Sequence, residues 1–317
     1  DTQVYSNTGG QACTSGFLGQ VSDMAQYGQA QQGKQEIRKE MGLIGMAHRT
    51  TYILQSSMAY PSHMIEGFVN GLMARRPALF TLYTSCQPEH GIADDAGNRQ
   101  AKMAVESRAF PLFKFDPDGG QTPVECLDLS MNPAMDDDWP MYELKYQEDG
   151  RDKTMEVPMT FVDFAVTEGR FRKHFRVAPP DTWNDNMVPL HEYLQLDADD
   201  RDGQLPFIWA VDRKSRLSRV LVAEPMVRSA QDRLDFWAVL KSLAGMDPNV
   251  ESTGDVETRV RAEVMQNLTS NLMQLMSGGG DLSALPAQPV SGGALPAPSG
   301  NGTGGDYMAP WIDTPEC

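Results

Sequence analysis

The first eleven residues, DTQVYSNTGGQ, bring together groups that could hold a metal-bound anion. Thr2 offers a hydroxyl oxygen, Val4 a backbone carbonyl oxygen, and Asn7 both a donor and an acceptor. Gly9 and Gly10 have no side chain, so a ligand can approach the backbone closely. Hard cations such as Mg²⁺ prefer oxygen ligands and often join a protein to a diphosphate. On spacing alone two interpretations stay open, a magnesium and diphosphate loop or an ordinary polar turn.

A strand, a helix and a second strand that could position this loop follow between residues 50 and 85. TTYILQSS and ALFTLYTS are β-branched and aromatic runs of strand length, and Pro61 marks a helix start between them. The apolar residues on one face of that helix are Ile65, Phe68, Val69 and Leu72. This order predicts a right-handed crossover unit in a parallel sheet. Such sheets bind ligands beyond the carboxyl ends of their strands, where we expect Asp1 and Cys86.

Further elements complete an α/β domain over residues 1–118. KQEIRKEMGLIGMAH places Ile37, Met41 and Ile44 at helical spacing and predicts a helix. CQPEHGIADDAGNRQAKMAVES predicts a loop that leads into a helix, and FPLFKFDP a short strand that closes the domain. His90 in the loop has two open interpretations, a proton shuttle or a hydrogen-bonded structural residue.

Residues 119–276 predict a small α+β module, because the sequence turns irregular through SMNPAMDDDWP and then regains periodicity. LPFIWAVD and LSRVLVAEP predict a hairpin, and SAQDRLDFWAVLKSLAG a helix with a Ser229 cap and a Gly245 stop. A further predicted helix carries aromatic residues at helical spacing, namely Phe161, Phe164, Phe171 and Phe175. Apolar residues recur every four positions from Val256 to Leu272 and predict an amphipathic helix.

Residues 277–305 are rich in Gly, Pro, Ser and Ala, which predicts a flexible linker because such a segment cannot bury enough apolar area. The whole chain of 317 residues carries 43 acidic and 27 basic residues, a balance that disfavours nucleic acid and anionic lipid as partners. No run of about 18 apolar residues occurs, so we expect no membrane span. The widely spaced cysteines are typical of reduced thiols in a cytoplasmic protein.

The opening segment closely resembles the one that follows a Gly-Asp-Gly motif in the pyruvate:ferredoxin oxidoreductase family. The likeness continues in YPSHMIEGFVNGLMARRPALFTLYTSCQPEHGI and in KMAVESRAFPLFKFDP, and it covers about residues 1–117. It implies the carboxyl-terminal part of a thiamine-diphosphate-binding domain. The final APWIDTPEC, in residues 306–317, resembles the lead-in to a ferredoxin-like segment. Family members continue after Gly-Gly-Gln with Ser/Ala-Ser-Lys, whereas this chain has Ala-Cys-Thr.

The resemblance assigns roles residue by residue. Thr2 and the Val4 carbonyl would coordinate Mg²⁺, and Asn7 would act as the catalytic residue facing the thiazolium ring and the substrate. Cys317 would be a ligand of a [4Fe–4S] cluster. The remaining residues expected to line the thiamine diphosphate are Ser6, Thr8, Gly9 and Gly10. A third magnesium ligand, the Asp of Gly-Asp-Gly, would precede residue 1, so we expect a fragment that is inactive alone.

The family activity would be oxidative decarboxylation of a 2-oxoacid, such as pyruvate, to acyl-coenzyme A and CO₂. Electrons would pass through iron–sulfur clusters to ferredoxin or flavodoxin, in a homodimer that also contains pyrimidine-binding and ferredoxin-like domains. Two other hypotheses stay open. One is a noncatalytic docking or assembly module that keeps the fold without cofactor. The other is a nucleotide-binding domain that uses the glycine pair. This pair belongs to neither of the usual phosphate-binding motifs, G-x-G-x-x-G or G-x₄-G-K-[ST], which makes this hypothesis the weakest.

Overall fold

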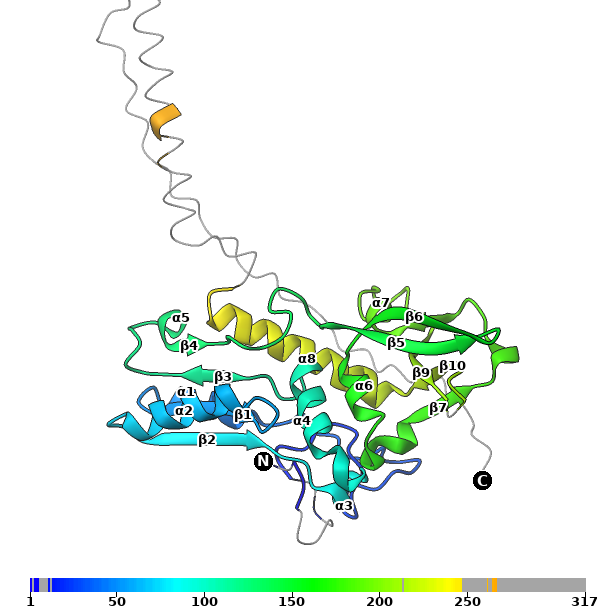
Figure 1. The fold of residues 1–317 in the computed structure, drawn as a ribbon, viewed down its shortest axis with the longest axis horizontal. Helices are drawn as coiled ribbons and strands as arrows, with labels where there is room; N and C mark the ends of the chain where they lie inside the picture. The colour runs from blue at the N-terminus through cyan, green and yellow to red at the C-terminus, as the bar shows by residue number, and fades with distance from the viewer. Residues whose placement is uncertain are drawn as a thin grey trace, which may run out of the picture. The chain divides into compact units, whose positions relative to one another are not determined.

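The computed structural model describes residues 1, 3–5, 11, 13–212, 214–246, 261 and 264–266. Residues Asp1–Ser252 form one compact unit, and Thr253–Cys317 form a second. The first unit has the mixed α/β fold class that the sequence predicts (Figure 1). In the second unit, residues 261 and 264–266 are helical, within the predicted amphipathic helix. The rest of that helix, the predicted linker and residues 306–317 lie outside the described residues.

The sheet nearest the opening segment has the strand order β2-β1-β3-β4. Its strands are β1 (Tyr52–Ser57), β2 (Ala78–Tyr83), β3 (Phe113–Phe115) and β4 (Leu127–Asp128). β1 and β2 are parallel and connected by α2 (Pro61–Met73), which confirms the predicted parallel pair with its helical connection. β3 runs antiparallel to β1, and β4 antiparallel to β3, so the sheet as a whole is mixed.

Helix α2 buries a different face from the one that its apolar side chains predict. The buried residues are His63, Gly67 and Gly71. A Cβ atom on Gly67 would lie 2.3 Å from the Leu54 side chain, so the helix backbone rests directly on the sheet. Ile65 is 60% exposed and Leu72 77% exposed. The predicted apolar face is wrong because the close approach at the glycines, and not side-chain hydrophobicity, decides which face meets the sheet.

Helix α1 (Met41–Ala47) covers less of the chain than the predicted helix. Residues 34–40 are not helical, and Ile37 is 53% exposed. Lys34 and Arg38 point inward instead, where the Lys34 ammonium donates to the carbonyl oxygens of Gly16 and Glu36. The helical prediction for this stretch is wrong because buried polar contacts override its apolar spacing. The next elements are α3 (Gln87–His90), η1 (Asp94–Ala96) and α4 (Gly97–Glu106), which confirm the predicted loop followed by a helix. The short helix α5 (Pro123–Cys126) follows after β3.

Two further sheets follow. β5 (Met141–Glu148) and β6 (Arg151–Pro158) form a two-stranded hairpin. The sequence analysis missed it, although its turn residues Asp149 and Gly150, both at positive φ, are a strong hairpin signal. The other sheet has the order β7-β10-β9-β8. Its strands are β7 (Phe175–Ala178), β8 (Met187–Pro189), β9 (Leu205–Val211) and β10 (Leu217–Val222), and the antiparallel β9–β10 pair confirms the predicted hairpin.

The predicted phenylalanine-rich helix is broken into three elements. They are α6 (Phe161–Ala165), the 3₁₀ helix η2 (Gly169–His174) and the start of β7 at Phe175. Phe161 and Phe164 pack edge-on against Phe17, and Phe171 packs against Phe161, so the rings face one core without one continuous helix. η3 (Pro180–Thr182) and α7 (Leu190–Tyr193) are short connections.

Helix α8 (Glu224–Leu243) runs along both sheet regions (Figure 1). Met226 belongs to the hydrophobic cluster that contains Phe17, whereas Trp237 belongs to the cluster that contains Ile53. The helix begins before Ser229, so the predicted cap is wrong, and the Ser229 hydroxyl donates instead to the Leu18 carbonyl. The predicted stop is confirmed by Gly245 at φ +71. Residues on both sides of position 118 share one hydrophobic cluster, and the predicted division there stays a prediction.

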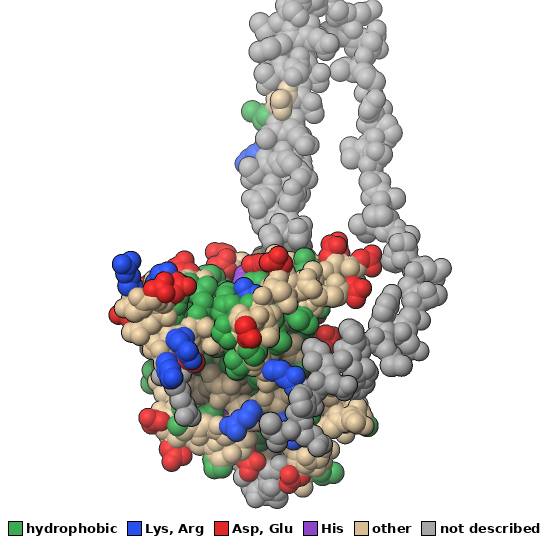
Figure 2. Space-filling model, turned by 90° about the vertical axis from the view of Figure 1, so that its right-hand side faces the viewer, with side chains coloured by type: hydrophobic (Ala, Val, Ile, Leu, Met, Phe, Trp, Pro, Cys, Tyr) green, Lys and Arg blue, Asp and Glu red, His purple; other side chains and the backbone are tan. Residues whose placement is uncertain are grey.

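Among the described residues, none of the helices has the length and apolar character needed to cross a membrane. On the face drawn in Figure 2, basic side chains are scattered among acidic ones and do not form a single stripe.

Candidate functional site

The opening segment lies at the carboxyl end of β2. The Asp1 backbone nitrogen donates to the Leu82 carbonyl oxygen, and the Thr84 amide donates to the Asp1 carbonyl oxygen at 3.2 Å. These two bonds flank Tyr83 as in parallel strand pairing. Cys86 follows directly, half-buried at the start of α3. The structure therefore places Asp1 and Cys86 at the sheet edge where the sequence analysis expects ligand-binding loops.

Only part of the predicted site belongs to the described residues. Val4 is half-buried in a bend of the chain. The predicted residues outside the described part are Thr2, Ser6, Asn7, Thr8, Gly9, Gly10 and Cys317. Within the described part, no group of three or more His, Cys, Asp or Glu side chains is arranged to hold a metal ion. The metal and cofactor roles of these residues stay predictions.

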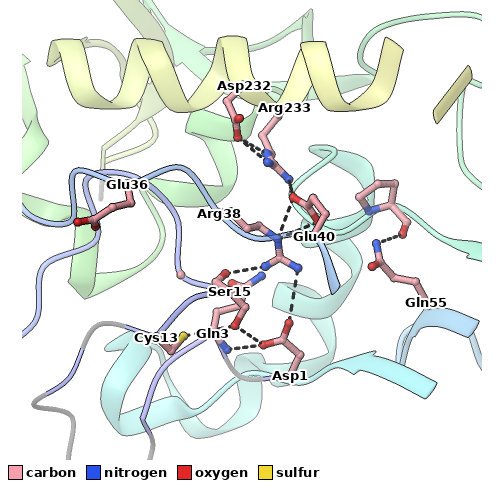
Figure 3. Close-up of polar contacts among 12 residues, drawn as sticks. Asp1, Gln3, Cys13, Ser15, Glu36, Arg38, Glu40, Gln55, Asp232 and Arg233 are labelled. Atoms are coloured by element: carbon pink, nitrogen blue, oxygen red, sulfur yellow. Dashed lines mark hydrogen bonds and ion pairs between the residues drawn. The ribbon is translucent and has the colours of Figure 1, made fainter. Parts of the chain in front are cut away.

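A first buried polar network holds the Asp1 carboxylate (Figure 3). One carboxylate oxygen accepts bonds from the Gln3 amide and the Ser15 hydroxyl, both at 2.9 Å. The other carboxylate oxygen lies 3.5 Å from the Arg38 guanidinium. Arg38 also donates to the Ser15 carbonyl at 2.7 Å, and its guanidinium stacks 5.2 Å from the Phe17 ring centre. Asp1 and Ser15 thus contact one guanidinium directly, and Gln3 is linked to it through the Asp1 carboxylate.

Glu40 links this network to helix α8 (Figure 3). Its carboxylate accepts from the Arg38 Nε at 3.1 Å and from the Arg233 guanidinium at 2.7 Å, while Arg233 also pairs with Asp232. Burial opposes ionisation of Glu40, but the two guanidinium groups outweigh it and lower the pKa of its carboxyl group. Glu40 is therefore an anion shared by two buried cations.

A second buried network holds Gln3 through residues in and next to η2. The Arg170 guanidinium donates to the Gln3 side-chain oxygen at 2.9 Å and to the Gln3 backbone carbonyl at 3.4 Å. It also donates to Gln20 at 3.1 Å and forms an ion pair with Glu168. Gln3 has φ +59, in the left-handed region that residues with a side chain seldom adopt. Its conformation is therefore held by surrounding contacts.

Glu168 extends this network to the loop that follows β2. Its carboxylate lies 3.2 Å from the His90 Nδ1 atom and accepts from the Gln100 amide at 2.9 Å. Burial opposes ionisation of Glu168, but Arg170 and His90 lower the pKa of its carboxyl group. His90 is fully buried, which favours the structural interpretation over a proton shuttle. Gly91 packs so closely on Gly169 that an added Cβ would lie 3.0 Å from the Gly169 Cα.

One donor of the opening segment has no partner among the described residues. A guanidinium can only donate, so Arg170 fixes the Gln3 side-chain oxygen toward itself and turns the Gln3 Nε2 group away. This buried Nε2 atom has no hydrogen-bond partner in the part of the chain that the structure describes. A buried unpaired donor is costly, and an acceptor such as a phosphate oxygen would satisfy it. An acceptor for this donor would therefore come from outside the described residues.

Sequence reasoning missed the charged residues that hold this edge of the sheet. They are Arg38, Glu40, Glu168, Arg170 and Arg233. Charged residues are seldom fully buried, so a single sequence gives no reason to place them inside. The short spacing of Glu168 and Arg170, two residues apart before a turn, is compatible with an exposed pair as well.

The chain is similar to several curated enzymes. It is 32% identical over 150 residues to pyruvate:ferredoxin oxidoreductase of Moorella thermoacetica, covering 46% of this chain and 12% of that protein. It is 31% identical over 128 residues to a probable pyruvate-flavodoxin oxidoreductase of Escherichia coli, covering 39% and 10% respectively. A pyruvate dehydrogenase [NADP(+)] of Cryptosporidium parvum is 32% identical over 126 residues, 39% of this chain and 6% of that protein.

These similarities confirm the resemblance to the pyruvate:ferredoxin and pyruvate–flavodoxin oxidoreductase family for part of the chain. The aligned part spans 12% or less of the length of these relatives. The chain matches no protein-family model.

Proposed function

We propose that this chain is part of a 2-oxoacid oxidoreductase that acts on pyruvate and that its opening segment forms one side of a thiamine diphosphate site. The observation that carries the proposal is the position of Asp1, bonded beside β2 at the carboxyl edge of a sheet with a parallel strand pair. The names of the similar enzymes support the same reaction class. The first of these arguments concerns the opening segment itself.

The donor set of the segment fits a magnesium-bound diphosphate. Thr2 and the Val4 carbonyl are oxygen ligands of the kind that Mg²⁺ prefers. The Gln3 Nε2 atom, which has no partner among the described residues, could donate to an anionic oxygen. Bound thiamine diphosphate would supply the carbon nucleophile on which a 2-oxoacid loses CO₂. Asn7 would orient the substrate through its amide. The residues that would line the cofactor are Ser6, Thr8, Gly9 and Gly10.

The complete protein would transfer the acyl group to coenzyme A and pass electrons through [4Fe–4S] clusters to ferredoxin or flavodoxin. Cys317 would be one cluster ligand, because cysteine thiolates are the usual ligands of such clusters. The remainder of the enzyme would supply the pyrimidine-binding and ferredoxin-like domains. We expect a cytoplasmic homodimer.

Three substitutions in the complete protein test the assignment. Thr2→Ala removes a metal ligand and should weaken thiamine diphosphate binding, whereas Val4→Ala keeps the carbonyl and should leave binding nearly unchanged. Asn7→Ala should retain cofactor binding and lower kcat, because its amide acts on the substrate. Calorimetric titration with thiamine diphosphate and Mg²⁺, together with turnover of pyruvate, measures both properties.

Equal loss of affinity in the Thr2 and Val4 variants, or wild-type turnover in the Asn7 variant, would contradict these roles. A complete protein that folds but binds no thiamine diphosphate would favour the alternative of a noncatalytic docking module.

A further inference from the structure

We propose that Glu168 and Arg170 are positioning residues that hold the two loops at the carboxyl edge of β2 in one arrangement. The two loops are the described part of the opening segment, residues 1 and 3–5, and the loop over residues 84–92. Glu168 and Arg170 come from the turn after α6, and Arg170 lies 167 positions from Gln3 in the chain. The significance for catalysis rests on the proposed function, whereas the positioning itself does not.

Arg170 fixes the opening segment through both ends of Gln3. Its two terminal nitrogens reach the backbone carbonyl and the side-chain oxygen of that residue. Gln20 adds a second tie, because its amide nitrogen donates to the same Gln3 carbonyl at 3.1 Å and its oxygen accepts from Arg170. A planar guanidinium with several donors in a fixed geometry suits this role better than an ammonium group. The strained φ of Gln3 is thus stabilised from outside its own loop.

Glu168 holds the second loop with the same carboxylate that holds Arg170. It contacts His90 at the end of α3, and the Tyr83 hydroxyl at the end of β2 donates to it at 3.5 Å. The neighbouring Gly169 packs directly on Gly91. The Glu168 carboxylate therefore contacts the second loop directly and the opening segment through Arg170. Replacing it should alter the conformation of both loops.

Stability alone does not account for this ion pair. The side chains of Glu168 and Arg170 are 0% and 1% exposed, so both charges have lost their hydration. Buried ion pairs often stabilise a fold no better than well-packed apolar residues of similar volume would. Their directional bonds can instead select one conformation, and here those bonds end on Gln3 and His90.

The test is hydrogen–deuterium exchange of the full chain, read at amides in each loop. The Thr84 amide, bonded to the Asp1 carbonyl, reports on the opening segment, and the His90 and Ile92 amides report on the second loop. Arg170→Met should raise exchange at all three by about tenfold or more, because a lost charge-assisted hydrogen bond shifts local opening by that order. Arg170→Lys keeps a cation beside Glu168 but lacks the several donors of the planar guanidinium, so it should accelerate amide exchange at Thr84 more than at His90.

Arg201→Met is the matched control. Arg201 donates to the Leu194 and Leu196 carbonyls, both at 2.9 Å, and stacks on Tyr193, all within eight positions of it in the chain. It should leave exchange in both loops unchanged. Unchanged loop exchange in Arg170→Met, or equal acceleration in Arg201→Met, would overturn the proposal. If Arg170→Met does not fold, the contrast of Arg170→Lys with wild type decides in the same way.

A second measurement separates this inference from the proposed function. In the complete protein, Arg170→Lys should raise the Kd for thiamine diphosphate several-fold, whereas Arg201→Met should not change it. A wild-type complete protein without cofactor binding would refute the proposed function, while the exchange data would still decide on the positioning role. Loosened loops with an unchanged Kd would refute the link to the cofactor site.

Discussion

Replacing Glu40 by Gln should strongly destabilise the described unit, because it removes the one anion that Arg38 and Arg233 share. The Glu40 side chain is 11% exposed, and each guanidinium side chain is 1% exposed. In the wild type, one Glu40 oxygen accepts from both cations and the other accepts from Arg38 at 3.1 Å. The Gln oxygen can replace the first acceptor, but its NH₂ group would then face the Arg38 Nε donor.

The expected loss follows from this geometry. Removing one partner of a buried ion pair costs about 3 to 5 kcal/mol, because the opposite charge stays buried. Asp1 and Asp232 remain near the two cations, which places the expected loss of unfolding free energy toward the lower end, about 3 kcal/mol. Urea unfolding followed by the fluorescence of buried Trp237 measures it.

Glu66→Gln is the matched control. Glu66 accepts a bond from Lys114 at 2.8 Å but is 56% exposed, so its substitution should cost about 1 kcal/mol or less. An equal and small loss in both variants would refute the assignment of Glu40 to a buried network.

The pH dependence gives an independent check on Glu40. Its pKa is lowered on folding, so its contribution to stability is fully present above the ordinary value of 4.5 and is lost as the pH falls through the folded value. The stability difference between wild type and Glu40→Gln should therefore shrink on acidification below pH 4.5. A difference that stays constant or grows in that range would contradict the pairing.

Two further predictions concern a pair of glycines and His63. Gly91→Ala should lower the free energy of unfolding in urea more than Gly150→Ala. Both positions have positive φ, but an added Cβ lies 3.0 Å from Gly169 at position 91 and has nothing within 4 Å at position 150. Equal losses would contradict the close packing of the loop. Burial lowers the pKa of His63 from 6.5 to about 4, so its imidazole is neutral when folded, and stability should fall as the pH drops from 6.5 toward 4 while the unfolded chain takes up the proton. His63→Asn should flatten this slope, and identical slopes would show that His63 does not titrate as described.

Local patterns predicted the strands and the connecting helix of the first sheet well. Two β-branched and aromatic runs and a helix beginning at Pro61 are signals carried by neighbouring residues, and β1, α2 and β2 follow them. Asp1 lies at the expected edge for the same reason, because the order of elements determines where the strands end. The Asp149-Gly150 turn carried an equally local signal that the sequence analysis did not use.

Features that depend on distant residues could not be predicted. The buried face of α2 is decided by Leu54 and Phe80 meeting Gly67 and Gly71, not by the apolar residues of the helix. The apolar spacing of residues 34–40 predicts a helix. The segment is not helical, because the buried Arg38 side chain pairs with Asp1, which is distant in the sequence.

The candidate site also combines features that local sequence predicts with features that depend on distant residues. The oxygen ligands of the opening segment can be recognised from their own sequence. In contrast, the contacts of Arg170 with Gln3 and of Arg233 with Glu40 join residues more than a hundred positions apart. Each guanidinium is a surface residue by its type and becomes buried only because its partners are present.

Pyruvate-dependent reduction of ferredoxin by the purified complete protein tests the central claim most directly. We predict that reduction requires thiamine diphosphate, Mg²⁺ and coenzyme A, with release of CO₂ from the carboxyl carbon of pyruvate, and that Asn7→Ala lowers its rate. Ferredoxin reduction that proceeds equally without thiamine diphosphate, or a folded complete protein that releases no CO₂ from pyruvate, would contradict the account.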